Sequence, residues 1–391
     1  MCARMHISQP ITLNVFDKPR AESSLLELCR GGKTSVDEIK RTFSISREQS
    51  QVYLNYAEAA KRLLMKLNEP YQSVMTITEL ISQEKTTAFS FEVLPPLKGA
   101  GIHKLQDDIR SLMEFAPKYI NITTHRSELV MKDLGNGLME RSRLRRRPGS
   151  VAVAAALQQE FGVPIVPHIL CSGFTREETE YVLIDLQYLG ITNLLLLRGD
   201  KAPEDKEFRP TEGGYSHTTQ LIAQINDYNN GRFIDGSEIK ETGPRFSYGV
   251  ACYPEKHEEA PNMTTDAAWF KKKIEMGAEY GVTQMFFDNR KYFDFVDNMR
   301  GDGVSVPIIP GIKPLVSKRQ LSVLPRVFHC DLPEELTTEA LKCKDDDQIK
   351  QLGIEWSVAQ CKELIRAGVP SIHFYMTGNT QSLRKIAEAI Y

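Results

Sequence analysis

The chain of 391 residues carries 49 Lys and Arg against 51 Asp and Glu, so its formal net charge is −2 and its pI is near 6.5. Hydrophobic residues make up 41% and charged residues 26%, proportions typical of a soluble enzyme. This balance disfavours a nucleic-acid-binding protein and a disordered chain. The chain has no run of 18 apolar residues and no apolar signal region, so we expect a cytoplasmic protein without a membrane span.

Residues 1–74 are predicted to form a small helical extension. They carry 11 Lys and Arg against 8 Asp and Glu, and residues 34–67 have the pattern of two helices, with a capping box at Ser46 and Gln49. Three roles stay open: packing on the rest of the chain or on another subunit, DNA binding through a helix-turn-helix, or an artefact of the start site if translation begins at Met75. The slight basic excess disfavours DNA binding.

From residue 86 onward, short apolar runs alternate with amphipathic segments. The runs mostly lack polar alternation, as expected for parallel strands that are buried on both faces. The predicted strands are 88–96, 118–125, 163–170, 191–200, 246–254, 282–288, 306–312 and 371–376. The clearest helical patterns between them are 103–115, 151–162, 176–190, 266–281 and 354–368, and the segment 313–370 has room for two helices.

Eight strands that are each followed by helical sequence predict an α/β fold, a (β/α)8 TIM barrel over residues 75–391. A doubly wound open sheet is the alternative, but the first strand is not followed by the G-x-G-x-x-G typical of that fold.

In a parallel barrel, functional residues collect where the strands end. Glu92 lies between Phe91 and Val93 before two prolines, so we expect an apolar setting that raises its pKa and suits a general acid. A structural carboxylate is the plainer interpretation. The other polar residues at predicted strand ends are Thr123, Thr124, His125, His168, Arg198, Gly199, Asp200, Tyr253, His257, Gln284 and Asp288.

The kind of ligand that this rim binds is predicted from the sequence motifs that are missing and from the side chains that are present. The sequence has no GxxxxGK[ST], HExxH or GxSxG motif, which leaves nucleotide hydrolysis, zinc peptidase and serine hydrolase chemistry without support. The histidines lack ligand-like spacing and the seven cysteines form no C-x-x-C pair, so we expect no metal. The remaining hydrogen-bonding side chains suit a large cofactor with phosphates and a heteroaromatic ring.

Seven motifs together resemble the 5,10-methylenetetrahydrofolate reductase family over residues 75–391. They are FSFEVLPP (89–96), PHILC (167–171), GITNLLLLRGD (190–200), ACYPEKHEEA (251–260), GVTQMFFD (281–288), PIIPGIKP (307–314) and HFY (373–375). The resemblance implies an oxidoreductase acting on CH–NH donors, whose barrel binds FAD. By a ping-pong mechanism it would take hydride from NADH or NADPH and then reduce methylenetetrahydrofolate to 5-methyltetrahydrofolate, which feeds methionine synthesis.

The resemblance also implies roles for individual residues. Glu92 matches the general acid that protonates N10 of the folate, Asp200 the carboxylate beside flavin and pterin, and Gln284 an amide that binds the pterin. Arg198 and Lys273 are suited to meet the pyrophosphate as charged donors. The positions that match FAD contacts are Thr123, His168, Arg198, Gly199, Asp200, His217, Thr218, Tyr253, His257, Asp266 and Lys273.

Two positions depart from the family pattern. We align His217 and Thr218 where the family often has Tyr-Ala, with Tyr215 as the alternative. Leu324 stands where some members place a Phe against substrate and nicotinamide. The chain ends at Tyr391, so we expect no C-terminal regulatory domain and no regulation by S-adenosylmethionine.

Several questions stay open at this point. The basic run 141–149 would suit a folate polyglutamate tail or a phosphate, but a solvated loop or a subunit contact is the plainer interpretation. We expect a homo-oligomer, and no feature separates NADH from NADPH as the donor. The alternatives to the reductase are a proline-dehydrogenase-like flavin barrel and a non-catalytic folate- or flavin-binding protein.

Overall fold

The structure, a computed structural model, describes residues 75–125, 128–201, 205, 207–241, 243–376 and 380–391. The helical extension predicted for residues 1–74 lies outside the described residues. In the described part of the chain, no helix is long and apolar enough to cross a membrane.

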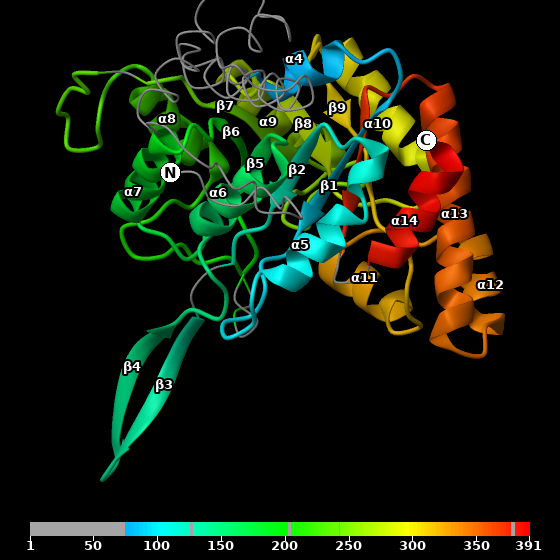
Figure 1. The fold of residues 1–391 in the computed structure, drawn as a ribbon, viewed down its shortest axis with the longest axis horizontal. Coiled ribbons are helices and arrows are strands. Elements are labelled where there is room, and N and C mark those ends of the chain that lie inside the picture. Colours follow the sequence, from blue (N-terminus) through cyan, green and yellow to red (C-terminus); the bar gives the residue numbers. More distant parts are fainter. Residues whose placement is uncertain (1–74, 126–127, 202–204, 206, 242, 377–379) are drawn as a thin grey trace, which may run out of the picture. The chain divides into compact units, whose positions relative to one another are not determined.

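Parallel strands form a nearly closed barrel with helices around it (Figure 1). The strand order is β10-β11-β1-β2-β5-β6-β7-β8-β9. β9 (Ile308–Ile309) pairs with β8, and β10 (Gly311–Ile312) pairs with β11. These two short strands are halves of one extended segment that is interrupted at Pro310, because proline has no N–H to donate to the ladder. Counted as one strand they close the sheet, which confirms the predicted (β/α)8 barrel.

The other barrel strands are β1 (Ala88–Val93), β2 (Tyr119–Ile122), β5 (Ile165–Leu170), β6 (Asn193–Leu197), β7 (Ser247–Cys252), β8 (Tyr280–Thr283) and β11 (Ser371–Tyr375). The helices are α4 (Ile77–Ser82), α5 (His103–Arg110), η1 (Met113–Phe115), α6 (Ser150–Phe161), α7 (Arg176–Tyr188), α8 (Thr218–Asn229), α9 (Met263–Glu275), α10 (Asn289–Gly301), α11 (Gln320–Phe328), α12 (Glu334–Lys342), α13 (Asp346–Arg366) and α14 (Thr380–Ile390).

Two of the differences from the predicted elements lie in the second half of the barrel. The sixth strand was expected at 282–288, but β8 ends at Thr283. Residues 285–287 are apolar for a different reason: Met285 and Phe287 belong to a separate buried cluster with α11, α12 and α13. The segment 313–370 contains these three helices instead of two.

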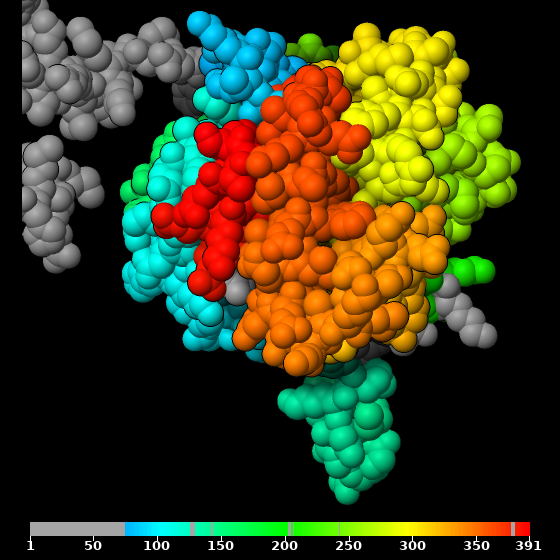
Figure 2. Space-filling model, turned by 90° about the vertical axis from the view of Figure 1, so that its right-hand side faces the viewer, coloured from blue at the N-terminus to red at the C-terminus, as the bar shows by residue number. Residues whose placement is uncertain are grey.

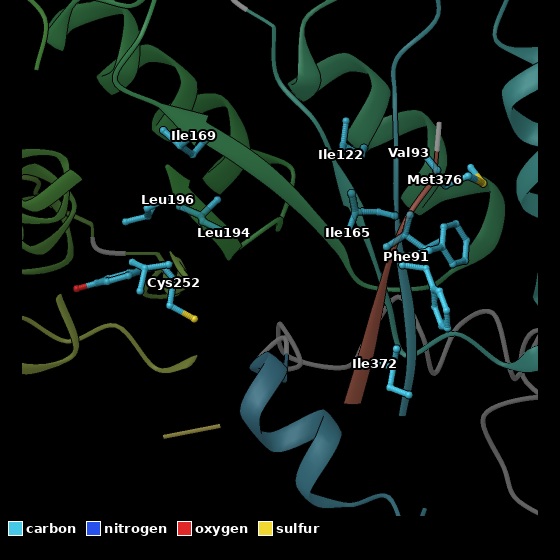
Figure 3. Close-up of a cluster of buried hydrophobic side chains, with 14 of the residues drawn as sticks. Phe91, Val93, Ile122, Ile165, Ile169, Leu194, Leu196, Cys252, Ile372 and Met376 are labelled. Atoms are coloured by element: carbon cyan, nitrogen blue, oxygen red, sulfur yellow. The ribbon is translucent and has the colours of Figure 1, made fainter. Parts of the chain in front are cut away.

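Side chains that point outward from the strands pack against the surrounding helices. Phe91, Ile122, Ile165 and Ile372 are nearly fully buried in this layer, part of which is drawn in Figure 3. Complete burial of such a side chain stabilises the fold by about 1.5–3 kcal/mol. The large apolar content of the predicted strands is therefore explained by the strand–helix layer.

Helix α4 closes the N-terminal end of the barrel. Ile77 and Ile81 are buried against barrel-interior side chains such as Tyr119 and Tyr280. The helix begins with a capping box at Thr76, and the backbone N–H of Ile77 donates to Asn193 Oδ1 at 3.2 Å. This end is filled by apolar packing and leaves the opposite end for polar side chains.

A β-hairpin follows β2 and projects from the barrel body (Figures 1 and 2). Its strands are β3 (Glu128–Gly135) and β4 (Leu138–Leu144), joined through residues 135–137, which all have positive φ. The basic run 141–149, interpreted as a loop, therefore begins inside β4. Its second half returns to the barrel, where Lys98 N–H donates to Arg146 O at 2.8 Å and Arg147 donates to Pro95 O.

Candidate active site

The side chains that point into the barrel become more polar toward the C-terminal end of β1. In β1 the series is Ala88, Ser90 and Glu92, because alternate residues of a strand point to the same side. The register places Ser90 beside His373 of β11, and it places Glu92 beside Asn121 of β2. The C-terminal end of the barrel thus gathers polar side chains from neighbouring strands.

Glu92 lies at the centre of this group, with its side chain 14% exposed. Its Oε2 is 3.9 Å from Nε2 of His168 and 3.9 Å from Nε2 of His373. Lys313, which follows β10, is also buried and interacts electrostatically with Glu92. We name Glu92, His168, Lys313 and His373 the mouth cluster.

The prediction of a raised pKa for Glu92 is wrong for this structure. Burial alone would raise the pKa. The hydrogen-bonding interaction with His373 and the electrostatic effects of the nearby basic side chains His168, His373 and Lys313 together outweigh burial, so the pKa lies below its ordinary value. Sequence reasoning saw the apolar neighbours along β1 but not the basic groups that other strands contribute.

His168 is held as a neutral imidazole. Burial lowers its pKa to about 4, although the charge of Glu92 acts in the opposite direction. Its Nε2 lies 3.2 Å from Asn121 Nδ2, which can only donate, so this ring nitrogen is the acceptor. The hydroxyl of Thr124 donates to the carbonyl of His168 at 2.5 Å and fixes the strand end.

Arg198 and Gly199 form the next part of the rim. The Arg198 guanidinium is paired with Glu259 and lies 4.5 Å from the ring centre of Phe208. Gly199 has φ +82°, and a Cβ there would overlap Ser172 Oγ. This glycine is therefore required by both its backbone conformation and the close approach of Ser172.

The loop after β7 brings several predicted cofactor residues together. The rings of Tyr253 and His257 meet edge to face with centres 4.8 Å apart. The backbone N–H of His257 donates to Asp266 Oδ2 at 3.0 Å, and burial raises the pKa of this carboxyl. Lys273, two turns further along α9, donates to Ala251 O at 2.7 Å, and burial lowers its pKa.

His217 and Thr218 lie at the start of α8. His217 is its N-cap residue, and its ring stacks on Trp269 of α9 with centres 6.5 Å apart. The alternative residue, Tyr215, is engaged with Arg176, whose guanidinium lies 5.2 Å from its ring centre. Trp269, which is exposed, was not predicted, although a Trp between Asp266 and Lys273 was a usable signal in the sequence.

Three of the other predicted residues lie just after strand ends of the same rim. Thr123 bonds Val93 O through its hydroxyl at 3.3 Å, and Asp200 is exposed directly after Gly199. Gln284 follows β8 and accepts the Met285 N–H at 3.0 Å, which orients its amide. Asp288 caps α10 and pairs with Arg290 instead. Leu324 is buried in α11.

Sequence reasoning missed Ser90, Asn121, Lys313 and His373. His373 and Lys313 lie within motifs that carried the resemblance, but neither received a role. The available signal was a polar residue at an inward position of an otherwise apolar strand, such as Ser90 in β1 and Asn121 in β2.

A closed parallel barrel with a polar cluster at its C-terminal end defines a TIM-barrel protein with its site at the usual end. Residues 76–391 match the family model described as Methylenetetrahydrofolate reductase. The chain belongs to this family, as its motifs predicted.

Individual relatives support the assignment. Methylenetetrahydrofolate reductase (NADH) 1 of Arabidopsis thaliana is 29% identical over 310 residues, 75% of this chain and 47% of that protein. The probable methylenetetrahydrofolate reductase (NADPH) of Caenorhabditis elegans is 27% identical over 82% of this chain and 44% of that protein. The 5,10-methylenetetrahydrofolate reductase of Pectobacterium carotovorum is 29% identical over 73% of this chain and 84% of that protein. This chain thus spans about half the length of the plant and nematode relatives.

Proposed function

We propose that this chain reduces 5,10-methylenetetrahydrofolate to 5-methyltetrahydrofolate with NADH or NADPH as the donor and FAD as the cofactor. The observation that carries the proposal is Glu92, a carboxylate held among basic groups at the open end of a barrel of this family. A carboxyl at that place is suited to exchange a proton with a bound amine.

The residues present fit a phosphate-bearing cofactor. Nε of Arg198 is buried and has no hydrogen-bond partner in the described part of the chain, so the guanidinium still has a donor to offer an anion. The edge-to-face rings of Tyr253 and His257 suit a planar ring system nearby. When bound, FAD supplies the acceptor and donor of hydride. We assign its binding to Thr123, His168, Arg198, Gly199, Asp200, His217, Thr218, Tyr253, His257, Asp266 and Lys273.

The chain's own side chains then divide the remaining work. Glu92 delivers a proton to N10 of the folate, which opens the five-membered ring and leaves the methylene carbon electron-poor. Gln284 bonds the pterin through its amide, and Asp200 orients it. Neutral His168 adds no positive charge beside Glu92 at neutral pH, so the carboxyl depends on His373 and Lys313 for its charge balance.

The test is anaerobic stopped-flow spectroscopy of the purified chain, following flavin absorbance. NADH or NADPH is expected to bleach the flavin, and methylenetetrahydrofolate is then expected to restore the absorbance. The faster nucleotide identifies the donor. Bleaching without folate-dependent recovery would contradict the folate assignment, and failure to bind FAD would contradict the cofactor assignment.

A further inference from the structure

We propose that His373 is the proton reservoir of Glu92: the two side chains share one proton, which rests on His373 and passes through Glu92 to the substrate. The inference rests on the proposed function for the last transfer. The sharing itself is a property of this chain's residues.

The hydrogen bonds of His373 fix which ring nitrogen faces Glu92. The hydroxyl of Ser90 donates to Ile372 O at 3.2 Å, and Ser90 Oγ lies 3.1 Å from Nδ1 of His373. With the single hydrogen of Ser90 directed to Ile372 O, its oxygen accepts from Nδ1–H. Nε2 is then the nitrogen directed at Glu92.

Nε2 of His373 is buried and has no hydrogen-bond partner within the described residues, and Glu92 Oε2 at 3.9 Å is its ionisable neighbour. If the imidazole were neutral with its proton on Nδ1, the lone pair of Nε2 would face a carboxylate, and this buried nitrogen would have no donor. One further proton on Nε2 gives the carboxylate a charged donor. The geometry therefore favours a pair that retains one proton.

The other groups around Glu92 do not offer this proton. His168 uses its Nε2 to accept from Asn121, and its pKa is about 4. His125, which interacts electrostatically with Glu92, has its pKa lowered by burial. Burial raises the pKa values of the two phenols around His373, Tyr119 and Tyr375, which stay neutral. Lys313 supplies a positive charge.

The transfer conserves protons and moves no electrons. The N–H bond at Nε2 of His373 breaks as an O–H bond forms on Glu92 Oε2, which requires the partly exposed carboxylate to approach by about 1 Å. That O–H bond then breaks as the amine nitrogen of the substrate gains the proton. The pair is left one proton short, and solvent at the mouth restores it.

Nitrogen NMR of the full-length chain labelled at histidine tests the resting state. At pH 7 we expect both ring nitrogens of His373 to be protonated, with the signals assigned by their loss in His373→Asn. Glu92→Gln is the matched variant, because its amide can donate to Nε2; we expect His373 to become neutral there. A neutral His373 in the wild-type chain would overturn the inference.

The pH dependence of folate-driven flavin reoxidation tests the transfer. In His373→Asn the proton must reside on Glu92 alone, so we expect the alkaline limb to move to lower pH by about one unit or more, because an ordinary carboxyl has a lower pKa than an ordinary imidazole. Lys313→Met is the comparison, because loss of a nearby positive charge favours the protonated pair, so its alkaline limb should not move to lower pH. An unchanged profile in His373→Asn contradicts the relay even if the reductase is active. Absence of folate reduction with a protonated His373 contradicts the proposed function and leaves the shared proton intact.

Discussion

The N-terminal end of the barrel and its C-terminal mouth use the same strands to bury opposite chemistry. At the N-terminal end, Ile77 and Ile81 of α4 pack on barrel-interior residues such as Tyr280. At the mouth, the inward side chains are Glu92, four residues after Ala88 in β1, and His373, two residues after Ser371 in β11. Along β1, for example, the inward side chain changes from the apolar Ala88 to the ionisable Glu92 within four residues.

The difference between the two ends concerns what burial costs. Apolar burial at the N-terminal end stabilises the fold by about 1.5–3 kcal/mol for each large side chain. Burial of ionisable groups at the mouth is unfavourable unless they are paired, and the mouth cluster supplies a basic group on each side of Glu92. One end therefore stabilises the barrel, and the other holds groups whose charge states are adjustable.

The largest expected effect separates the two ends by activity. Glu92→Gln should slow folate-driven flavin reoxidation by about 10²–10⁴-fold, because the amide cannot deliver a proton. Flavin reduction by the nucleotide should be unaffected. The control is Glu279→Gln at the opposite end, where the carboxylate accepts from Thr78 and Ser247. Stopped-flow measurement of both half-reactions decides, and equal losses in both would contradict the role of Glu92.

The second effect separates the ends by stability. Ile77→Ala should lower the free energy of unfolding by about 2–5 kcal/mol, because it leaves a cavity between α4 and the barrel. Leu341→Ala, at a side chain that is 68% exposed, should change it little. Urea unfolding measures both variants. A loss for Ile77→Ala as small as that of the control would show that α4 does not stabilise the barrel.

The third effect is the acid sensitivity that the mouth imposes. The folded pKa of His168 is about 4, below the ordinary value of 6.5, so the unfolded chain binds more protons between these values. The stability contribution is present above pH 6.5 and lost as the pH falls toward 4. Between pH 7 and pH 5 the loss should be about 2 kcal/mol. Urea unfolding at a series of pH values measures this dependence. His168→Gln should remove this part of the slope of unfolding free energy against pH, whereas His103→Gln, at an exposed histidine, should keep it.

The smallest effect tests the tight backbone of the rim. Gly199→Ala and Gly99→Ala both place an alanine at positive φ, which costs about 1–2 kcal/mol. A Cβ at Gly99 meets nothing within 4 Å, whereas at Gly199 it would overlap Ser172 Oγ. We expect Gly199→Ala to be the more destabilised by about 1 kcal/mol. Thermal unfolding compares them, and equal losses would show that Ser172 moves aside freely.

Much of the fold followed from local sequence patterns. The apolar runs at 163–170 and 371–376 coincide closely with β5 and β11, because each run has enough buried surface to identify it. The apolar run at 282–288 led to a predicted strand that is too long, because Met285 and Phe287 are buried by α11 to α13 and not by the sheet. The hairpin of β3 and β4 was missed, because its strands are largely exposed and lack an apolar run.

The site could be predicted in its residue types but not in its charge. The strand ends identified Glu92, His168 and Arg198, since parallel strands bring their C-terminal ends to one side. The pKa of Glu92 depends on His373 and Lys313, which follow it by more than 200 residues and reach it only when the barrel closes. The direction in which the pKa of Glu92 shifts could therefore not be predicted from the residues around it in the sequence.

The sequence by itself determined the order of the barrel strands, several of the rim residues and the family, because these depend on local periodicity and on motifs that are contiguous in the chain. Only the tertiary structure decided which polar groups meet. Closure of the sheet across Pro310 brings β11 beside β1, and Ser90 then fixes the ring of His373 toward Glu92. Electrostatic interactions depend on distance in space, so the protonation of the mouth cluster is a property of the closed barrel.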